Sequence, residues 1–304
     1  MTPIRIILDT DIGTDVDDLI ALASILGSPE YQIEAITCVY GAVLLRARCA
    51  LKLYKLRGLE PPPVLLGASR PLLGLEPIYW EGHEGEGLLE AGDEHLQPDP
   101  EHAVDAIIGI VMANPGQIHL VCIGPLTNIA QALLREPRLA GAVAGLTIMG
   151  GVMRGLEWLD LPYAEHNMRC DPEAAQIVFT SGAPIRLVPL DITTRVRIRP
   201  ADVAQIRAAG TPFHAIVADQ IERYPRYQRQ GYTNLHDPLA VASLLQPDLL
   251  TWTPVLIDVE LNSRFAAGAT FMRAPADNET TAIEVAVGVD AARFEAFAAE
   301  RLRA

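Results

Sequence analysis

Positive charge is scarce in this sequence. Lysine and arginine together number 24 against 38 aspartates and glutamates, which gives a formal net charge of −14 and a pI near 4.9. Lysine itself occurs only at Lys52 and Lys55. The phosphates of nucleic acid and the head groups of anionic membranes repel such a surface, so the composition argues against both as partners. It favours a small neutral or cationic ligand.

Long hydrophobic runs and paired cysteine motifs are also absent. No stretch of about eighteen apolar residues occurs, and the first apolar strand begins within a few residues of Met1, where a signal peptide would otherwise lie. We therefore expect a soluble, cytoplasmic protein. The four cysteines lack Cys-x-x-Cys spacing and lie in or beside apolar stretches, which predicts buried, reduced thiols. They are Cys38, Cys49, Cys122 and Cys170.

What the sequence has in excess is aspartate, concentrated after the first predicted strand. Carboxylates this close repel one another at low dielectric, so some must coordinate a cation or accept hydrogen bonds from a ligand. Oxygen ligands favour a hard ion, Ca²⁺ or Mg²⁺. An EF-hand loop fits poorly, because Gly13 and Val16 stand where that loop needs a ligand and a glycine. The apolar run 4–8 leads into five aspartates within ten residues, Asp9, Asp11, Asp15, Asp17 and Asp18.

Strand and helix patterns alternate along the chain. We expect one domain, residues 1–304, with an α/β fold: an open, Rossmann-like, mostly parallel sheet flanked by helices, with the active site at the C-terminal ends of the strands. The first helix should hold Asp15, Asp17 and Asp18 in its first turn. Strands are predicted near residues 4–8, 32–40, 64–66, 117–123, 143–149, 185–190, 255–260 and 281–287, and helices near 19–26, 42–57, 101–112, 201–227, and after 128, 171, 237 and 291.

A long segment without a strand or helix pattern begins at Gly67 and runs past residue 98. Loops of this length in compact domains are typically functional lids or disordered. The part from Trp80 to Gly87 is rich in glycine and polar side chains. We therefore expect His83, in that part, to face a ligand.

Two more polar groups lie beside predicted strands and helices, Glu165-His166-Asn167 and His236-Asp237. With the aspartate cluster and in this order, they resemble the nucleoside hydrolase family (inosine-uridine preferring), which cleaves the N-glycosidic bond of ribonucleosides to free base and ribose. The resemblance covers essentially the whole chain. Its other motifs are Gly124-Pro125-Leu126-Thr127-Asn128-Ile129-Ala130, Met149-Gly150-Gly151, Asp171-Pro172-Glu173-Ala174-Ala175 and Pro238 after His236-Asp237.

The resemblance implies a calcium-dependent N-ribohydrolase. Ca²⁺ would be held by Asp11, Asp18, Asp237 and the main-chain carbonyl of Ile123. The ion would hold ribose hydroxyls and a water whose pKa it lowers, and Asp11 would take the proton of that water as general base. Hydroxide would then add at the anomeric carbon through an oxocarbenium-like state. The resemblance also implies a homodimer or homotetramer acting in nucleoside salvage.

The same resemblance assigns the substrate contacts. Asp17 and Asn167 would bind ribose hydroxyls, and Glu165 would bind the 5′-hydroxyl. His236 lies where a leaving base could be protonated. Asp9 would orient the site from behind the residues that touch the metal.

The chain departs from the common family form in three places. The aspartate segment carries two extra residues, so Asp15 is additional and could take the role assigned to Asp17. Gly41-Ala42 stands where the family usually has Gly-Asn. A second asparagine of the site has no counterpart between Val152 and Leu161, although Arg154, Glu157 or Trp158 could compensate.

Two alternatives remain open from the sequence. A haloacid-dehalogenase-like phosphatase would use Asp9 as nucleophile and Asp11 as acid/base with Mg²⁺, but it needs a downstream lysine, and both lysines lie on an early helix. A nucleoside- or sugar-binding protein that kept the metal site and lost catalysis is consistent with Ala42.

Overall fold

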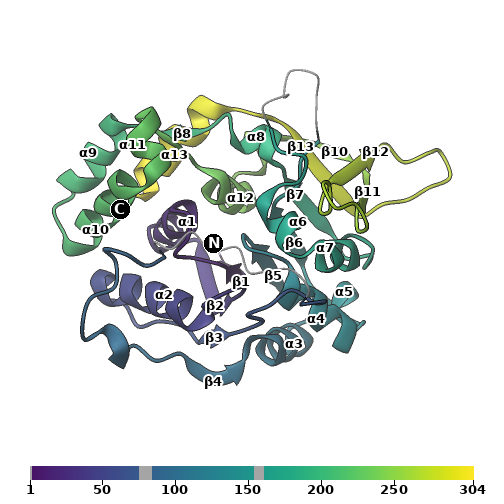
Figure 1. Cartoon of the computed structure of the whole chain (residues 1–304), viewed down its shortest axis with the longest axis horizontal. Coiled ribbons are helices and arrows are strands. Elements are labelled where there is room, and N and C mark those ends of the chain that lie inside the picture. Colours follow the sequence, from purple (N-terminus) through teal and green to yellow (C-terminus); the bar gives the residue numbers. More distant parts are fainter. Residues whose placement is uncertain (1, 75–83, 154–160) are drawn as a thin grey trace.

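A nine-stranded sheet forms the centre of the computed structural model, which describes residues 2–74, 84–153 and 161–304 (Figure 1). The strand order is β10-β13-β7-β6-β5-β1-β2-β3-β4, and neighbours are parallel except for the antiparallel pair β10 and β13. The strands are β1 Ile4–Thr10, β2 Tyr31–Cys38, β3 Val64–Leu66, β4 Asp99–His102, β5 Ile118–Cys122, β6 Gly145–Met149, β7 Ile185–Val188, β10 Leu250–Pro254 and β13 Ile283–Val289.

Helices cover both faces of this sheet, and two small antiparallel sheets lie outside it. The helices are α1 Asp17–Leu26, α2 Val43–Arg57, α3 Ala103–Ala113, α4 Thr127–Arg135, α5 Leu139–Ala142, α6 His166–Cys170, α7 Pro172–Phe179, α8 Leu190–Thr193, α9 Pro200–Ala208, α10 Pro212–Arg223, α11 Pro225–Gln230, α12 His236–Leu245 and α13 Ala291–Arg301. Short 3₁₀ helices are η1 Asp93–His95 and η2 Pro247–Leu249, and the small sheets pair β8 Arg197–Ile198 with β9 Thr233–Asn234 and β11 Leu256–Val259 with β12 Thr270–Arg273.

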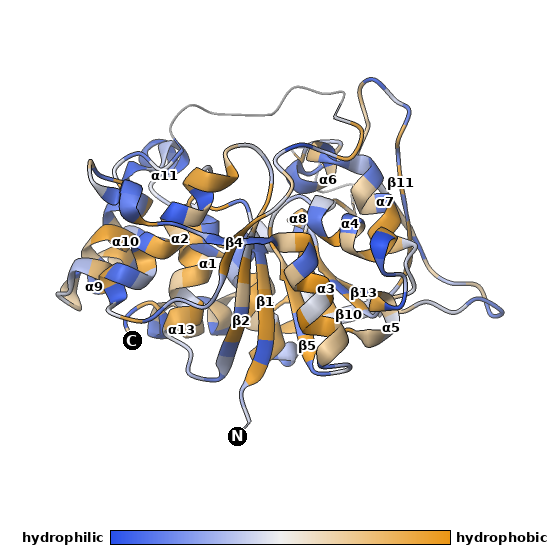
Figure 2. Cartoon of the chain, turned by 90° about the horizontal axis from the view of Figure 1, so that it is seen from below, coloured by the Kyte–Doolittle hydropathy of each residue, from blue (hydrophilic) through white to orange (hydrophobic). Residues whose placement is uncertain are grey.

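The central strand β1 packs against a separate hydrophobic core on each face. Ile6 and Leu8 belong to one core with residues of α1, α2 and α12, whereas Ile7 belongs to the other with residues of α3, α4 and α7. Successive side chains of a strand point to opposite faces, so an unbroken apolar run is what a strand covered on both faces requires. Figure 2 shows the largely hydrophobic strands β1, β2 and β5 between the two groups of helices. The architecture confirms the predicted α/β fold.

The connections change direction at β1, and this places the candidate site. From β1 the chain adds β2, β3 and β4 on one side, and β5, β6 and β7 then build outward on the other. The loops that follow β1 and β5 therefore leave the sheet in opposite directions and open a crevice at its C-terminal edge. Open α/β sheets bind ligands in that crevice. The aspartate cluster follows β1, and Ile123 follows β5.

Several predicted boundaries are wrong, and proline explains how one predicted helix is divided. Helix α1 begins at Asp17 after the N-cap Val16, so Asp15 precedes the helix instead of lying in its first turn. The helical region 201–227 is divided into α9, α10 and α11, because Pro212 and Pro225 each begin a new helix. Residues 99–102 pair with β3, so α3 starts after them. Strand β6 starts at Gly145, two residues later than predicted.

Of the remaining expectations from the sequence, some are confirmed and others concern residues that the structure does not describe. All four cysteines are free and buried, as predicted. The long segment after Gly67 contains η1, but Trp80 and His83 lie outside the described residues, as do Arg154, Glu157 and Trp158. Among the described helices, none has both the length and the apolar character needed to cross a bilayer.

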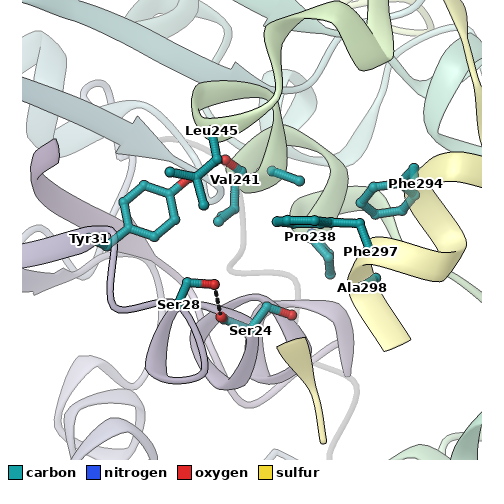
Figure 3. Close-up of a pocket in the computed structure, with 10 residues that line it drawn as sticks. Ser24, Ser28, Tyr31, Pro238, Val241, Leu245, Phe294, Phe297 and Ala298 are labelled. Atoms are coloured by element: carbon teal, nitrogen blue, oxygen red, sulfur yellow. Dashed lines mark hydrogen bonds between the residues drawn. The ribbon is translucent and has the colours of Figure 1, made fainter. Parts of the chain in front are cut away.

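A small gap between α1, α12 and α13 is a packing feature (Figure 3). Its volume is about 10 Å³, which is room for about one water molecule. Ser28 Oγ donates to Ser24 O at 2.7 Å, and Tyr31 Oη donates to Val241 O at 2.6 Å, so the polar groups here mainly tie helices and strand together. A nucleoside cannot enter it.

Candidate active site

Three buried carboxylates converge at the C-terminal edge of the sheet. Asp17 and Asp18 lie in the first turn of α1, and Asp237 lies in the first turn of α12. One carboxylate oxygen from each lies within 4.8 Å of the others. Helices α1 and α12 pack against each other and present their N-termini at the same edge, where the helix dipole favours negative charge.

Burial makes this arrangement costly unless a cation is present. Burial and the neighbouring carboxylates raise the pKa of Asp17 to about 8, and the same causes raise the pKa values of Asp18 and Asp237 well above the ordinary range. Buried anions that face one another either bind protons or bind a cation. Because the ligands are carboxylate oxygens, the site fits a hard divalent ion.

Asp11 lies beside this group, at the end of β1. It is buried, and its negative charge raises the pKa of Asp18 further, although its oxygens are not part of the group within 4.8 Å. A Cβ atom at Gly124 would lie 2.9 Å from both the backbone nitrogen and Oδ1 of Asp11. Glycine at this position therefore allows the loop after β5 to approach Asp11 closely.

Arg46 is a buried cation at this site, and no sequence motif indicated its role. It lies on α2 with 1% of its side chain exposed, and its Nη2 lies 3.9 Å from Asp11 Oδ2. Its Nε donates to Tyr40 O at 2.6 Å and its Nη1 to Ile12 O at 3.2 Å. The Tyr40 backbone has φ +63°, the only positive φ of a non-glycine residue in the described chain. Arg46 thus joins the loop after β1 to the loop after β2.

Asp9 is fully buried near the end of β1. Its Oδ1 accepts hydrogen bonds from Thr37 Oγ1 at 2.5 Å and Asn128 Nδ2 at 2.8 Å. Oδ2 has no partner among the described residues. Burial raises the pKa of Asp9 to about 7, against the lowering effect of these two hydrogen bonds. Asn128 belongs to the motif at residues 124–130, from which no role could be predicted for it, and its amide fixes Asp9.

Asn167 and Glu165 connect the strand ends to α6. Asn167 Nδ2 donates to Ile123 O at 3.0 Å and to Met149 O at 3.2 Å. The Glu165 carboxylate caps α6, since it accepts from the backbone nitrogens of Asn167 at 2.8 Å and Met168 at 3.2 Å. The predicted metal-binding carbonyl of Ile123 and the two predicted substrate contacts therefore belong to one network.

His236 lies next to Asp237 at the start of α12 and is buried. Its Nδ1 is 2.6 Å from Thr193 Oγ1. Burial, with a smaller effect of the positive charge on Arg226, lowers the pKa of His236 to about 3. The imidazole is thus neutral at physiological pH.

A cavity of about 290 Å³ lies between the loop after β1, the segment that contains Leu88, and the junction of α10 and α11; its lining includes Asp15 and Val16, which directly precede Asp17, but none of the three cluster carboxylates. Asp15 and Tyr224 line it. Tyr227 and Tyr232 follow Tyr224 in the sequence but lie elsewhere: Tyr227 is buried in a hydrophobic core, and the ring of Tyr232 stacks with Arg197.

Comparison with known proteins identifies the family of this chain. The profile of the family described as inosine-uridine preferring nucleoside hydrolase matches residues 6–296. The chain belongs to the nucleoside hydrolase family. This nucleoside hydrolase is therefore an enzyme of the N-ribohydrolase class, and the predicted resemblance is confirmed. Family membership also argues against the phosphatase alternative, whose two candidate lysines both form ion pairs with Asp93.

Similar proteins differ in the base that their names specify. The pyrimidine-specific ribonucleoside hydrolase RihA of Salmonella arizonae is 35% identical over 313 residues, with 98% of each chain covered. A plant nucleoside hydrolase, PpNRh1, is 31% identical, with TM-score 0.88 and 99% of each chain covered. The purine-preferring ribonucleoside hydrolase from Gardnerella vaginalis is 32% identical, with TM-score 0.88 and 98% of each chain covered. Membership of the family thus leaves base preference open.

The raised pKa values predict a pH-dependent stability of the metal-free enzyme. In the folded state the pKa of Asp17 is about 8 rather than 3.8, so the folded protein holds a proton that the unfolded chain releases between these values. The stabilisation present below about pH 4 is lost as the pH rises towards 8. We expect the Tm of chelator-treated protein to fall over this range and the addition of calcium to restore it.

The test variant is Asp237→Asn, which removes one of the three facing carboxylates and should make the fall in Tm with pH shallower. Asp277→Asn removes an equal charge from an exposed position and should leave the slope unchanged. Equal slopes for the wild type and both variants would contradict the assignment of the effect to this cluster.

Arg46 and Arg48 provide a matched pair on one helix. Arg46→Met leaves the buried acceptors Tyr40 O and Ile12 O unpaired, at a cost of about 1–3 kcal/mol each, whereas Arg48 donates to Leu96 O and Glu94 O near the surface. We expect Arg46→Met to lower both the free energy of unfolding and kcat, by about tenfold or more for kcat. Arg48→Met should change either little, and equal effects would contradict the positioning role.

Proposed function

We propose that this protein hydrolyses the N-glycosidic bond of ribonucleosides in a calcium-dependent reaction, to give free base and ribose. The observation that carries the proposal is the group of buried carboxylates of Asp17, Asp18 and Asp237 beside a cavity of nucleobase size, in a chain of this family. The cavity holds about 290 Å³. The binding-protein alternative is tested by the same assays, because it predicts binding without turnover.

The residues that would hold the ion are Asp11, Asp18, Asp237 and the carbonyl of Ile123. When bound, Ca²⁺ supplies positive charge that lowers the pKa of water and polarises the ribose hydroxyls. Asp18 Oδ1 accepts from Thr10 Oγ1 at 2.5 Å, which holds one member of this set in place, although the oxygens that lie within 4.8 Å of Asp18 and Asp237 are those of Asp17 and not of Asp11. A carbonyl oxygen has two lone pairs, so Ile123 O can accept from Asn167 and still face an ion.

Asp11 is the proposed general base. Its position at the end of β1, against Gly124 and Arg46, fixes the carboxylate at the edge of the site. It would take a proton from the attacking water while the bond between base and sugar breaks through an oxocarbenium-like state. Asp17 and Asn167 would bind ribose hydroxyls, and Glu165 the 5′-hydroxyl.

His236 is the proposed partner of the leaving base. Its pKa of about 3 means that it acts as a neutral hydrogen-bond donor and not as an imidazolium. A hydrogen bond from the Thr193 hydroxyl to Nδ1 would place the ring proton on Nε2, so that the Nε2–H group can donate a hydrogen bond to the base. Thr193 therefore supports the proposed tautomer.

Substitution of the base residue tests the reaction directly. Asp11→Asn should lower kcat about a thousandfold or more, because the variant lacks both a metal ligand and the group that accepts the proton. Release of base from a panel of nucleosides measures it. Asp277→Asn, which changes an exposed aspartate, should retain the wild-type rate. A wild-type protein that binds nucleosides without releasing base would overturn the proposal.

A second test concerns the leaving group. His236→Ala should slow natural nucleosides by about a hundredfold or more, because their bases depart poorly without a hydrogen-bond donor beside them. A nitrophenyl riboside, whose leaving group needs no proton, should lose far less. Comparison of kcat/KM for the two substrates in one variant supplies the control, since misfolding would lower both. If both fall by the same factor, His236 has another role.

A further inference from the structure

The carbonyl of Ile123 is the one proposed metal ligand that is not an aspartate, and it lies just beyond the sheet. Strand β5 ends at Cys122, and the backbone N–H of Ile123 donates to Asp9 O at 2.9 Å. In the part of the chain that the structure describes, the hydrogen-bond donor to Ile123 O is a side chain, that of Asn167. The strand therefore holds the nitrogen of Ile123, and Asn167 holds its oxygen.

The amide of Asn167 uses both of its N–H groups on the backbone. Asn167 lies on α6 with 5% of its surface exposed, and its Nδ2 donates to Ile123 O at 3.0 Å and to Met149 O at 3.2 Å. Both partners are acceptors, so the reversed amide would place its oxygen against two carbonyl oxygens. The orientation of the amide is thus fixed by its surroundings.

This orientation limits what Asn167 can offer to a substrate. A primary amide has two N–H donors, and both are already engaged. Its Oδ1 accepts no hydrogen bond from the residues that the structure describes. The contact with ribose that the sequence predicted can therefore be made only by Oδ1, as an acceptor, while the nitrogen serves the chain.

We propose that Asn167 is a positioning residue of the calcium site, whose amide orients the Ile123 carbonyl and thereby sets the affinity for the ion. This inference rests on the proposed function, since it takes Ile123 O as a ligand. The second bond, to Met149 O, ties the amide to the end of β6, so the carbonyl is held by a side chain that is itself fixed. Removal of a group that orients a metal ligand typically costs about 10- to 100-fold in affinity.

The experiment is calorimetric titration of Ca²⁺ into chelator-treated protein, with no nucleoside present. Asn167→Leu keeps the branched shape of the side chain and removes both donors. We expect the Kd for Ca²⁺ to rise about tenfold or more. A residue that only contacts ribose would leave this Kd unchanged, because no sugar is present, and an unchanged Kd would overturn the inference.

Asn234→Leu is the matched control. Asn234 is also buried, and its Nδ2 also donates to two backbone carbonyls, Thr194 O at 2.9 Å and Val196 O at 3.2 Å. Its loss should lower the Tm by a similar amount and leave the Kd for Ca²⁺ within about twofold, because neither carbonyl is a proposed ligand. An equal rise of Kd in both variants would indicate general loosening and overturn the inference.

Asn167→Ser keeps the test decisive where the leucine variant does not fold. Its hydroxyl is one bond shorter than the amide nitrogen, so it cannot hold both carbonyls, and the same rise in Kd is expected.

Release of base as a function of calcium concentration separates this inference from the proposed function. In Asn167→Leu the calcium concentration that gives half-maximal activity should rise by the same factor as the Kd. A wild type that hydrolyses nucleosides, with an unchanged Kd in the variant, would leave the proposed function standing and overturn the inference. In a wild type that binds Ca²⁺ without hydrolysis the proposed function fails, and the change in Kd still decides the role of Asn167.

Discussion

Mutual repulsion among buried carboxylates is the constraint on which the structure of this site depends. Asp17, Asp18 and Asp237 lie within 4.8 Å of one another through their oxygens and out of contact with bulk water, which raises their pKa values. The protein offsets part of the cost with two helix N-termini and with the buried guanidinium of Arg46. The remainder would be offset by a bound divalent cation, which binds most tightly where protein groups leave negative charge uncompensated.

The fold satisfies this constraint by bringing distant segments to one edge of a parallel sheet. The change of direction between β1 and β5 opens the crevice, and the packing of α12 against α1 brings Asp237 to Asp17 and Asp18. Close approach needs small residues and fixed side chains. Gly124 admits the loop after β5 to Asp11, and Asn128 and Thr37 hold Asp9 behind it. The chemistry therefore rests on backbone packing as much as on the aspartates.

The sequence predicted the parts of this arrangement that depend on local pattern. The apolar run of β1 and the five aspartates after it were sufficient to place a site at a strand end, and the ordered motifs identified the family. Arg46 could not be predicted, because its role depends on the path of the Tyr40 backbone and on a loop thirty-four residues away. Helix ends were misplaced where a proline restarts a helix, as at Pro212 and Pro225. The two carbonyls that the Asn167 amide holds are likewise visible only in three dimensions.

We propose above all that Asp11, Asp18, Asp237 and the Ile123 carbonyl, next to Asp17, hold a calcium ion that the hydrolysis of nucleosides requires. Elemental analysis of undialysed protein, combined with release of base before and after chelation, tests it most directly. We expect one calcium per chain, loss of activity on removal of the ion, recovery on addition of Ca²⁺, and no bound calcium in Asp18→Asn. Bound zinc, or full activity in protein freed of metal, would contradict it.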